Sequence, residues 1–327
     1  MAAGPDEFDL IRRYFDWAPR QPGVALGVGD DAALIEPPSG TQLVVSTDML
    51  IAERHFPRST PPEAVAHKAL AVNLSDLAAM GASPLAFTLS IGLASTDERW
   101  LERFSSGLRE AAGRWGCDLV GGDTVAAPRL TLSVAAFGFL PAGSAIRRGG
   151  AAAGDRVAVT GTIGDAALGL MLALGEVEAP SALTADDRAY LLERLNRPEP
   201  RLSAGQALRE AASAGLDVSD GLLQDLGHLL AASELAAEID LDALPLSPAA
   251  RRWLSERPAD LERLVGGGDD YELVLALPAD VALDPSWGVT VIGRLVDDGL
   301  PGEIRERAGR PLSGPRGYNH FRGAGHE

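Results

Sequence analysis

The sequence predicts an α/β protein, in the broad sense that includes α+β, with two domains. Its 327 residues exceed the length of an ordinary single domain, and 46% of them are hydrophobic, which is sufficient for packed cores. Helix-like and strand-like patterns alternate on both sides of a segment rich in Gly and Ala at residues 141–154. We therefore expect one domain over residues 1–143 and a second over residues 150–327.

The first half predicts a βαββαβ-type domain. Apolar residues at helical spacing indicate an N-terminal helix that ends before Pro19, and Pro61-Pro62-Glu63 opens a long second helix that Gly81 closes. Short apolar runs bounded by turn residues indicate strands. The expected elements are a helix at 6–17, strands at 32–35 and 42–46, a helix at 61–80, a strand at 86–92, a helix at 97–115, and strands at 119–120 and 130–138.

The second half predicts a further α/β domain. An apolar strand at 156–160 is followed by the turn Gly161-Thr162-Ile163-Gly164, which leads into a helix, and two more helices flank Pro198 and Pro200. The remaining expected elements are a strand at 216–218, a helix at 221–233, and strands at 271–276 and 289–293.

The composition excludes several classes of function. With 29 Lys and Arg against 46 Asp and Glu, the formal net charge is −17, so nucleic acid and anionic membranes are not expected partners. The single cysteine, Cys117, can form neither an intrachain disulfide nor a Cys-based zinc site, and we expect it to be buried. We find no signal peptide and no apolar run long enough to span a bilayer, so we expect a cytoplasmic location.

Aspartates recur at turns throughout the chain. Carboxylates at loop tips are hard ligands that suit Mg²⁺ and, through it, phosphate, and a cluster of like charges is stable only when cations bind it. We therefore interpret the chain as a Mg-dependent enzyme that handles a nucleotide. The six segments are Gly29-Asp30-Asp31, Ser46-Thr47-Asp48, Asn73-Leu74-Ser75-Asp76, Gly121-Gly122-Asp123, Asp217-Val218-Ser219-Asp220 and Gly268-Asp269-Asp270.

Each of these segments also has a structural explanation. Residues 27–31 alone are typical of a hairpin turn, and Ser46-Thr47-Asp48 is either a cap or a ligand set at the end of a strand. Asn73 and Asp76 share one face of a helix among apolar neighbours, which favours a polar partner over a simple surface stripe.

The segment at 217–221 lies at a strand-to-helix junction. Ser219 or Asp220 is a natural N-cap, which leaves Asp217 unexplained, and the helix N-terminus also favours bound phosphate. Arg147-Arg148 is either solvated surface or a bidentate contact to a phosphate. Because the chain has no P-loop, protein-kinase, GxSxG or HExxH motif, any ATP site must depend on metal held by carboxylates.

Taken together, these segments resemble the thiamine-monophosphate kinase family, part of the superfamily that includes aminoimidazole ribonucleotide synthetase. The match runs along nearly the whole chain, and its most specific parts are residues 68–82 and the closing motif Gly317-Tyr318-Asn319-His320-Phe321. The other matching segments are residues 27–34, 46–48, 55–56, 121–124, 147, 154–155, 160–161, 217–222 and 268–273.

The resemblance implies Mg- and ATP-dependent phosphorylation of thiamine phosphate, giving thiamine diphosphate and ADP in thiamine diphosphate biosynthesis. It also implies a homodimer formed by joining the sheets of the N-terminal domains, with ATP bound across the dimer interface. The implied ligands of several Mg²⁺ ions are Asp30, Asp31, Ser46, Thr47, Asp48, Asp76, Asp123, Asp217 and Asp220. The implied ATP contacts are Gly122, Asp123, Arg147 and Ser219, and the implied thiamine phosphate contacts are His55, Asp269 and Tyr318.

The chemistry that this resemblance implies needs no catalytic side chain. The acceptor is itself a phosphate with roughly −1.5 to −2 charges at neutral pH, so its oxygen is already a usable nucleophile. Several Mg²⁺ ions would neutralise both polyanions and align them for direct transfer. One departure is Asp269, where the family usually has Glu.

Two alternatives remain open at this point. One alternative is a sibling synthetase of the superfamily. Some of these enzymes need a cysteine near one terminus, and this chain has none there. Aminoimidazole ribonucleotide synthetase remains an alternative, but that enzyme lacks the closing aromatic motif found here. The other is a noncatalytic Mg-nucleotide binding protein, which the intact aspartate set disfavours because an idle site has no physical reason to tolerate clustered charge.

Overall fold

The computed structural model describes residues 7–175, 178–307, 312, 317 and 318. Contacts within the chain divide it into two compact units. Unit 1 comprises Met1–Leu77 and Ala82–Ala145, and unit 2 comprises Ala78–Gly81 and Ile146–Glu327. The mixed α/β class is confirmed. The assignment of nucleotide binding and dimerisation to residues 1–143 stays a prediction, as does the boundary before residue 150.

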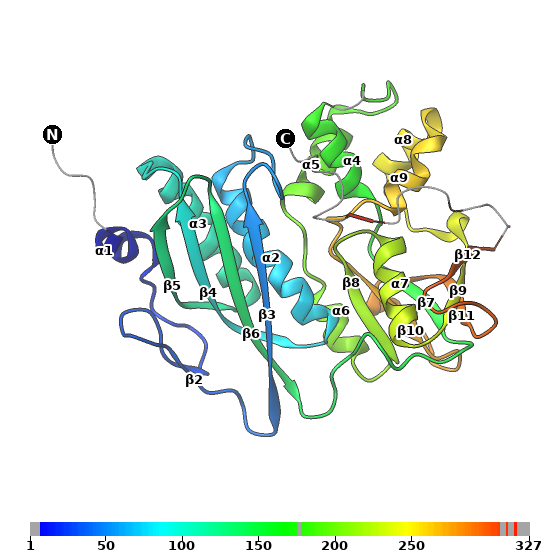
Figure 1. Ribbon diagram of the computed structural model, residues 1–327, viewed down its shortest axis with the longest axis horizontal. Coiled ribbons are helices and arrows are strands. Elements are labelled where there is room, and N and C mark those ends of the chain that lie inside the picture. The colour runs from blue at the N-terminus through cyan, green and yellow to red at the C-terminus, as the bar shows by residue number, and fades with distance from the viewer. Residues whose placement is uncertain (1–6, 176–177, 308–311, 313–316, 319–327) are drawn as a thin grey trace. The chain divides into compact units, whose positions relative to one another are not determined.

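Unit 1 is built on a four-stranded sheet with the strand order β3-β6-β4-β5 (Figure 1). Strand β4 pairs in parallel with β5, and the other two pairings are antiparallel. Chain order is β3, α2, β4, α3, β5, β6, that is βαβαββ, so the expected βαββαβ order is wrong although the expected strands and helices of this sheet are present. The bounds are β3 Thr41–Ile51, α2 Pro62–Ala79, β4 Ser83–Leu93, α3 Glu98–Trp115, β5 Asp118–Ala126 and β6 Thr131–Pro141.

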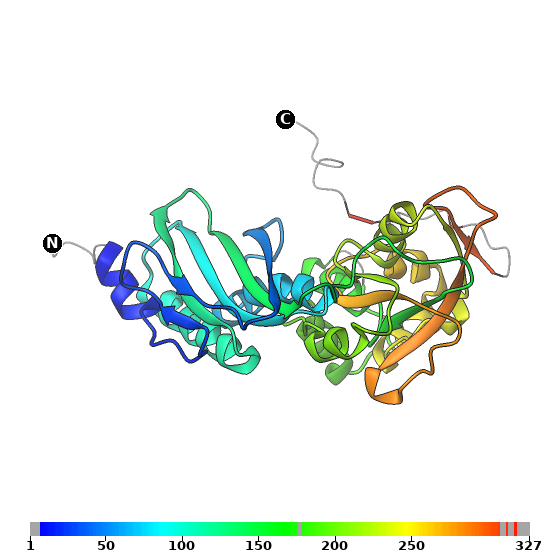
Figure 2. The ribbon, with the colours of Figure 1, turned by 90° about the horizontal axis from the view of Figure 1, so that it is seen from below.

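Helices α2 and α3 lie on the same face of this sheet (Figure 2). Helix α2 is apolar on nearly all sides and is almost entirely buried, as expected for a helix inside a core. Helix α3 is capped by Asp97, whose carboxylate accepts the N–H groups of Arg99 and Trp100, and it ends at the left-handed Gly116. Cys117 follows and is fully buried, which confirms the sequence-based expectation.

The other face of the sheet carries no helix among the described residues, and we call it the open face. The N-terminal segment forms the helix α1 (Glu7–Leu10), the π-helical turn η1 (Ile11–Phe15) and a short hairpin of β1 (Val24–Leu26) and β2 (Leu34–Ile35). Residues of the hairpin pack with Phe137 and Phe139 of β6, so they cover part of the open face. The exposed apolar side chains that remain on β3 and β5 are Leu43, Val45, Met49 and Val125.

Unit 2 is built on a six-stranded mixed sheet with the order β12-β9-β11-β7-β10-β8. Among the described strands of this sheet, β12 and β9 pair in parallel and the other neighbours are antiparallel. Side chains alternate between two cores, so Val157 and Val159 of β7 join the larger cluster while Ala158 joins the smaller one on the opposite face. The strands are β7 Arg156–Thr160, β8 Ala214–Val218, β9 Ala236–Ile239, β10 Glu272–Leu277, β11 Val289–Val296 and β12 Ile304–Glu306.

Unit 2 contains the expected helix after Gly164, the two expected helices that flank Pro198 and Pro200, and a helix at 222–232 where 221–233 was expected. Helices α8 and α9 and strands β9 and β12 were not expected from the sequence. Strand β9 has the sequence Ala-Ala-Glu-Ile, which has little β-propensity, and only its pairing with β11 and β12 makes it a strand. The helices are α4 Asp165–Leu174, α5 Ala185–Asn196, α6 Leu202–Leu208, α7 Leu222–Ala232, α8 Pro248–Glu256 and α9 Leu261–Val265. In the described part of the chain, no helix is long and apolar enough to cross a membrane.

Candidate functional site

Three predicted metal ligands in unit 1 lie on the side of the sheet that α2 covers. The hydroxyl of Ser46 on β3 donates a hydrogen bond to the carboxylate of Asp76 on α2. The backbone N–H of Asp48 donates to Asn73 Oδ1 at 2.9 Å. Since side chains alternate along a strand, Asp48 and Ser46 lie on the same face of β3. Strand and helix therefore bring Ser46, Asp48 and Asp76 to one side of the sheet.

Asn73 is the polar link between α2 and β3. Its side chain is buried, its Oδ1 accepts from Asp48, and its Nδ2 donates to the carbonyl of Ala69 at 3.0 Å. A buried amide requires such partners. The sequence-based expectation that Asn73 has a polar partner is confirmed.

Thr47 lies between Ser46 and Asp48 and faces the opposite way. Its hydroxyl donates to the carbonyl of Val134 on the neighbouring strand β6 at 2.9 Å. The register pairs Thr47 with Ala135, so its side chain lies on the open face. Thr47 is thus separated from Ser46 and Asp48 by the thickness of the sheet.

Asp123 also lies on the open face, far from Asp48 within one chain. The register pairs Met49 with Ser133, Ser133 with Ser90, and Ser90 with Asp123, one residue on each of the four strands. Partners across neighbouring strands share a face of the sheet. Because strands lie about 4.8 Å apart, the three spacings from β3 to β5 amount to roughly 14 Å. A single copy of unit 1 therefore does not bring Asp123 to Asp48.

Gly122 precedes Asp123 and can only be glycine. A Cβ at this position would lie 1.8 Å from the carbonyl oxygen of Leu89 on β4. Gly122 is also exposed to solvent. This is the arrangement in which a glycine lets a ligand approach the main chain.

Asp30, Asp31 and His55 lie in connecting segments of unit 1. Asp30 and Asp31 are exposed in the loop between β1 and β2, where the carboxylate of Asp30 accepts the N–H of Asp31 at 2.8 Å. His55 follows β3, and its Nδ1 accepts the N–H of Ile51 at 2.9 Å. A neutral His55 therefore carries its proton on Nε2.

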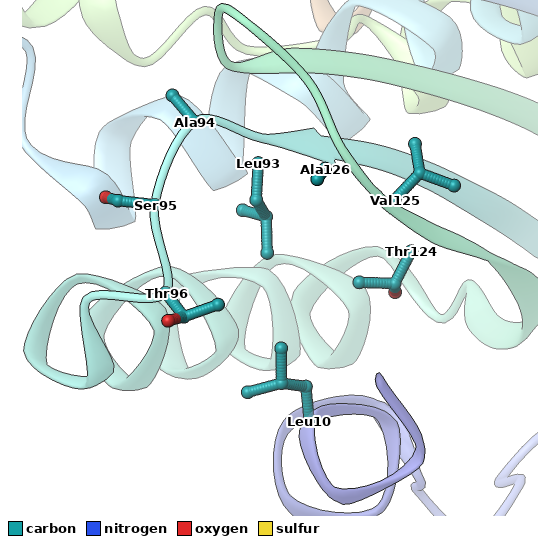
Figure 3. A pocket seen from close by; sticks show the side chains of 8 residues that line it. All are labelled: Leu10, Leu93, Ala94, Ser95, Thr96, Thr124, Val125 and Ala126. Atoms are coloured by element: carbon teal, nitrogen blue, oxygen red, sulfur yellow. The ribbon is translucent and has the colours of Figure 1, made fainter. Parts of the chain in front are cut away.

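A pocket of about 540 Å³ opens at the C-terminal ends of the parallel strands β4 and β5 (Figure 3). Leu10 of α1 and Leu93 of β4 point toward one another across it, and Thr124 borders it next to Asp123. Its lining is mostly apolar, and none of the predicted site residues lines it. The lining residues are Leu10, Leu93, Ala94, Ser95, Thr96, Thr124, Val125 and Ala126.

Two separated segments of unit 2 join at the end of strand β8. The N–H of Asp269 donates to the carbonyl of Ser219, and the N–H of Tyr271 donates to that of Val218, both at 2.8 Å. Gly268 makes this approach possible, because a Cβ there would lie 2.3 Å from the Ser219 carbonyl oxygen. The loop before β10 is thereby held against the predicted metal and nucleotide segment.

A third segment, which contains Tyr318, also contacts the residues at the end of β8. The N–H of Tyr318 donates to the carbonyl of Asp220 at 3.0 Å. Gln224 Nε2 contacts both, with 2.8 Å to Asp220 Oδ2 and 3.0 Å to the carbonyl of Tyr318. Of the closing aromatic motif, Asn319, His320 and Phe321 lie outside the described residues.

Asp217 and Arg147 lie beside these segments. Asp217 is a mostly buried residue of β8, and it pairs with Leu273 of β10 and shares its face. Arg147 is exposed, and its carbonyl accepts the N–H of Gly215 at 2.9 Å, two residues before Asp217. Unit 2 therefore gathers most of its predicted site residues around the end of β8: Asp217, Ser219, Asp220, Asp269 and Tyr318.

Asp225, which lies outside the predicted site, holds the turn before α7. Its Oδ2 accepts the N–H groups of Asp220 and Gly221 at 3.0 Å each. Burial raises the pKa of Asp225 to about 7; the nearby charge of Asp220 adds to this rise, and the backbone hydrogen bonds oppose it. The expectation that Ser219 or Asp220 caps α7 is wrong, because Gly221 occupies the N-cap position and Asp225 satisfies the backbone from inside the helix.

The segment Asp269–Tyr271 has an unusual backbone. Asp269 and Tyr271 have φ angles of 70° and 52°, in the left-handed region that favours glycine. This conformation costs roughly 1–2 kcal/mol per L-residue. The hydroxyl of Tyr271 donates to Asp269 Oδ1 at 3.2 Å, so the two residues also contact each other through their side chains.

Two buried carboxylates lie next to these strained residues: Asp270, which belongs to one of the six acidic segments but not to the predicted site, and Glu272. Asp270 accepts the N–H groups of Gly164 at 2.6 Å and Ala166 at 3.3 Å, at the start of α4. Burial raises the pKa of Asp270 well above its ordinary value, against the opposing effects of Gly164 and the charge of Arg194. The local pattern included Asp270 among the acidic turns, but no local pattern indicates its partners, which are more than 100 residues away in the sequence.

The second flanking carboxylate, Glu272, is fully buried between two arginines. It accepts hydrogen bonds from Arg194 Nη2 at 2.8 Å and from Arg201 Nε at 2.6 Å. A second nitrogen of Arg201 contacts its other oxygen, and the hydroxyl of Thr160 donates to Glu272 at 2.7 Å. Both oxygens of the carboxylate are thus satisfied by charge-assisted hydrogen bonds.

Within residues 7–175, 178–307, 312, 317 and 318, no group of three or more His, Cys, Asp or Glu side chains is arranged to hold a metal ion. Ser46, whose oxygen lies against Asp76, falls outside this set of residue types. The metal ligands that the sequence suggested therefore stay a prediction.

Both halves of the sequence match known protein domains. Residues 29–140 match the N-terminal domain of AIR synthase related proteins, and residues 152–303 match the C-terminal domain. Thiamine-monophosphate kinase of Escherichia coli K12 is 44% identical over 331 residues, which covers 98% of this chain and 99% of that protein.

Two solved structures are similar over most of the chain. Thiamine-monophosphate kinase from Stenotrophomonas maltophilia K279a has a TM-score of 0.80 and 43% identity, covering 88% of this chain and 92% of that one. AaThiL complexed with AMPPCP and TMP has a TM-score of 0.78 and 33% identity, covering 90% of this chain and 92% of that one.

Proposed function

The chain belongs to the thiamine-monophosphate kinase family of AIR synthase related proteins, and we propose that it works through Mg²⁺ ions held by carboxylates. Its reaction is the ATP-dependent phosphorylation of thiamine phosphate to thiamine diphosphate. What remains to be assigned is which residues bind the metal, the nucleotide and the acceptor.

The contact between Ser46 and Asp76 is the observation that carries the metal assignment. It joins a hydroxyl and a carboxylate from two different elements, with Asp48 on the same strand face. Oxygen ligands of this kind suit Mg²⁺. The proposed ligands are Asp30, Asp31, Ser46, Thr47, Asp48, Asp76, Asp123, Asp217 and Asp220.

Bound Mg²⁺ would neutralise the two polyanions and favour in-line transfer. The chain's own contribution is to position them. Three residues are proposed ATP contacts. Gly122 offers exposed backbone to a phosphate, Ser219 offers its hydroxyl or its backbone, and Arg147 offers its guanidinium. His55, Asp269 and Tyr318 are the proposed contacts to thiamine phosphate.

No side chain needs to act as a base in this reaction. The attacking oxygen belongs to a phosphate that is largely ionised at neutral pH. Cys117 is excluded as a nucleophile, since it is fully buried and burial raises its pKa.

We also propose that the active form is a homodimer joined through unit 1. Two features support this. The open face exposes Leu43, Val45 and Met49 on the unpaired edge strand β3, which is unusual for a surface in water. In addition, Asp123 lies about 14 Å from β3 within one chain, so a site containing both Asp48 and Asp123 requires a second copy.

The activity is tested directly by mass spectrometry. Purified protein incubated with thiamine phosphate, ATP and Mg²⁺ should form thiamine diphosphate and ADP in equal amounts. The same mixture with EDTA should form neither, because the metal would be removed. Turnover of a different phosphorylated acceptor, with none of thiamine phosphate, would contradict the proposal.

The dimer is tested by complementation. Asp48→Asn and Asp123→Asn homodimers should both be inactive. Mixed and re-equilibrated, they should recover up to about a quarter of wild-type activity, since half of the dimers are then mixed and each contains one intact site. No recovery despite mass-spectrometric detection of mixed dimers would place both residues of a site in one chain.

A further inference from the structure

The segment Asp269–Tyr271 combines a left-handed backbone with neighbouring buried carboxylates. Two residues that are not glycine adopt the left-handed conformation, at φ angles of 70° and 52°. The residues next to them, Asp270 and Glu272, are buried carboxylates. A strained backbone persists only where the surroundings hold it, and such strain is concentrated at functional sites.

The surroundings hold this segment from three directions. The backbone N–H groups of Asp269 and Tyr271 are fixed to the β8 end. Asp270 is fixed to the start of α4 through the N–H of Gly164. Glu272 is fixed by a pair of arginines that come from different elements, Arg194 in α5 and Arg201 just before α6.

The arginine pair is an expensive arrangement for a purely structural role. Arg194 and Arg201 both bind the carboxylate of Glu272, which has no exposed surface, and Arg194 also lies 3.8 Å from the buried Asp165. Desolvation of such charges offsets most of the attraction between them, so they contribute little net stability. What a forked, bidentate contact does provide is geometric precision.

We propose that Arg194 and Arg201 are positioning residues for thiamine phosphate, which act through Glu272 to fix the carboxylate of Asp269. The proposal rests on the proposed contact between Asp269 and the substrate. An aspartate side chain has only two torsions, χ1 and χ2, so in a given rotamer its carboxylate moves with the main chain. Small displacements of a positioned group are costly, since about 1 Å can change a rate by 100-fold.

Arg201→Met is the principal test, because Arg194 remains to neutralise Glu272 and the unit should stay folded. The KM for thiamine phosphate should rise roughly tenfold. The KM for ATP should stay within twofold, because the arginine acts on the acceptor side. Arg201→Lys keeps the charge but loses the fork, and it should give a smaller rise.

Arg252→Met is the matched control. Arg252 also binds a largely buried carboxylate of unit 2 through two nitrogens, that of Asp187, yet it belongs to no predicted site. Arg252→Met should lower the melting temperature about as much as Arg201→Met does, and it should leave the KM values for thiamine phosphate and ATP unchanged. An equal rise in the KM for thiamine phosphate in this control would assign the effect of Arg201 to general loss of stability.

Asp269→Gly separates this proposal from the one on which it rests. Glycine accepts the left-handed backbone, so the fold is kept while the carboxylate is removed. If the KM for thiamine phosphate is unchanged in Asp269→Gly, the substrate contact itself is wrong. If it rises in Asp269→Gly but not in Arg201→Met, the contact stands and the positioning role fails.

The double variant gives the sharpest result. When Asp269 is already glycine, Arg201→Met should raise the KM for thiamine phosphate no further, because the arginine acts only through that carboxylate. Additive effects of the two substitutions would show that Arg201 acts by another route and would overturn the proposal.

Discussion

The two units hold their proposed site residues in different ways. In unit 1, Ser46, Asp48 and Asp76 are positioned by a strand and a helix, and Asn73 links the two elements. In unit 2, Asp220 and Asp269 lie in loops that are fixed by buried carboxylates and by backbone in strained conformations. Regular elements position side chains without strain, whereas loops need dedicated partners.

This difference has a consequence for mutation. A substitution of a proposed ligand in unit 1 changes the site, but it leaves intact the backbone hydrogen bonds of the strand and helix that position the side chain. A substitution in the cross-linked loops of unit 2 changes the loop itself. Activity and stability should therefore be separable in unit 1 and coupled in unit 2.

Asp48→Asn should produce the largest effect on activity. The amide keeps the size of the side chain but removes the charge that Mg²⁺ requires, so kcat/KM should fall on the order of 1,000-fold. The free energy of unfolding should change by less than about 0.5 kcal/mol, because the N–H of Asp48 still reaches Asn73. Steady-state kinetics and urea unfolding measure the two quantities, with the exposed Asp16→Asn as control. Wild-type activity would remove Asp48 from the metal site.

Gly268→Ala should lower stability and activity together. The new Cβ would lie 2.3 Å from the carbonyl oxygen of Ser219, so the loop must move away from β8. We expect a loss of about 3 kcal/mol in the free energy of unfolding, measured in urea. Gly227→Ala in helix α7 is the control, since its φ also lies outside the left-handed region and its Cβ would meet nothing nearer than 3.9 Å, so it should not lower the free energy of unfolding. Equal losses would mean that contact with Ser219 is unimportant.

Asp270→Asn should change how the stability of the protein depends on pH. The folded carboxyl has a raised pKa, whereas the unfolded one titrates near its ordinary value of 3.8. Between these values the folded state holds a proton that the unfolded state has lost, so this group makes stability fall as pH rises. The variant cannot ionise and should show a shallower decrease between pH 5 and pH 8 in urea unfolding. Identical slopes for both proteins would mean that Asp270 is ionised in the folded state.

Labelling of the Cys117 thiol should show the smallest effect, and it tests how readily unit 1 opens in the native protein. The thiol is fully buried beside β5, and burial raises its pKa, so it should not react with iodoacetamide at pH 8 without denaturant. Complete labelling should follow in 6 M guanidinium. Rapid labelling of the native protein would show that the elements which position Asp48 and Asp76 open readily.

Much of the fold follows from local pattern. The strand at residues 156–160 and the helices at 61–80 and 97–115 appear within a residue or two of their expected bounds, because each carries its own periodicity, cap or stop. Strand β3 extends to Ile51, well beyond the expected 42–46, because pairing with β6 continues through the polar Ser46-Thr47-Asp48. Strand pairing is a long-range effect that no local window contains.

The sequence by itself determined which residues are candidates, because acidic side chains beside glycine mark turns that can bind metal and phosphate. It also determined the family, through ordered motifs along the whole chain. Only the tertiary structure decided that Thr47 faces away from Ser46, that Asp123 lies three strands from Asp48, and that Arg201 reaches Glu272. These relations depend on register, strand order and contacts across 71 residues, which arise only when distant segments pack together.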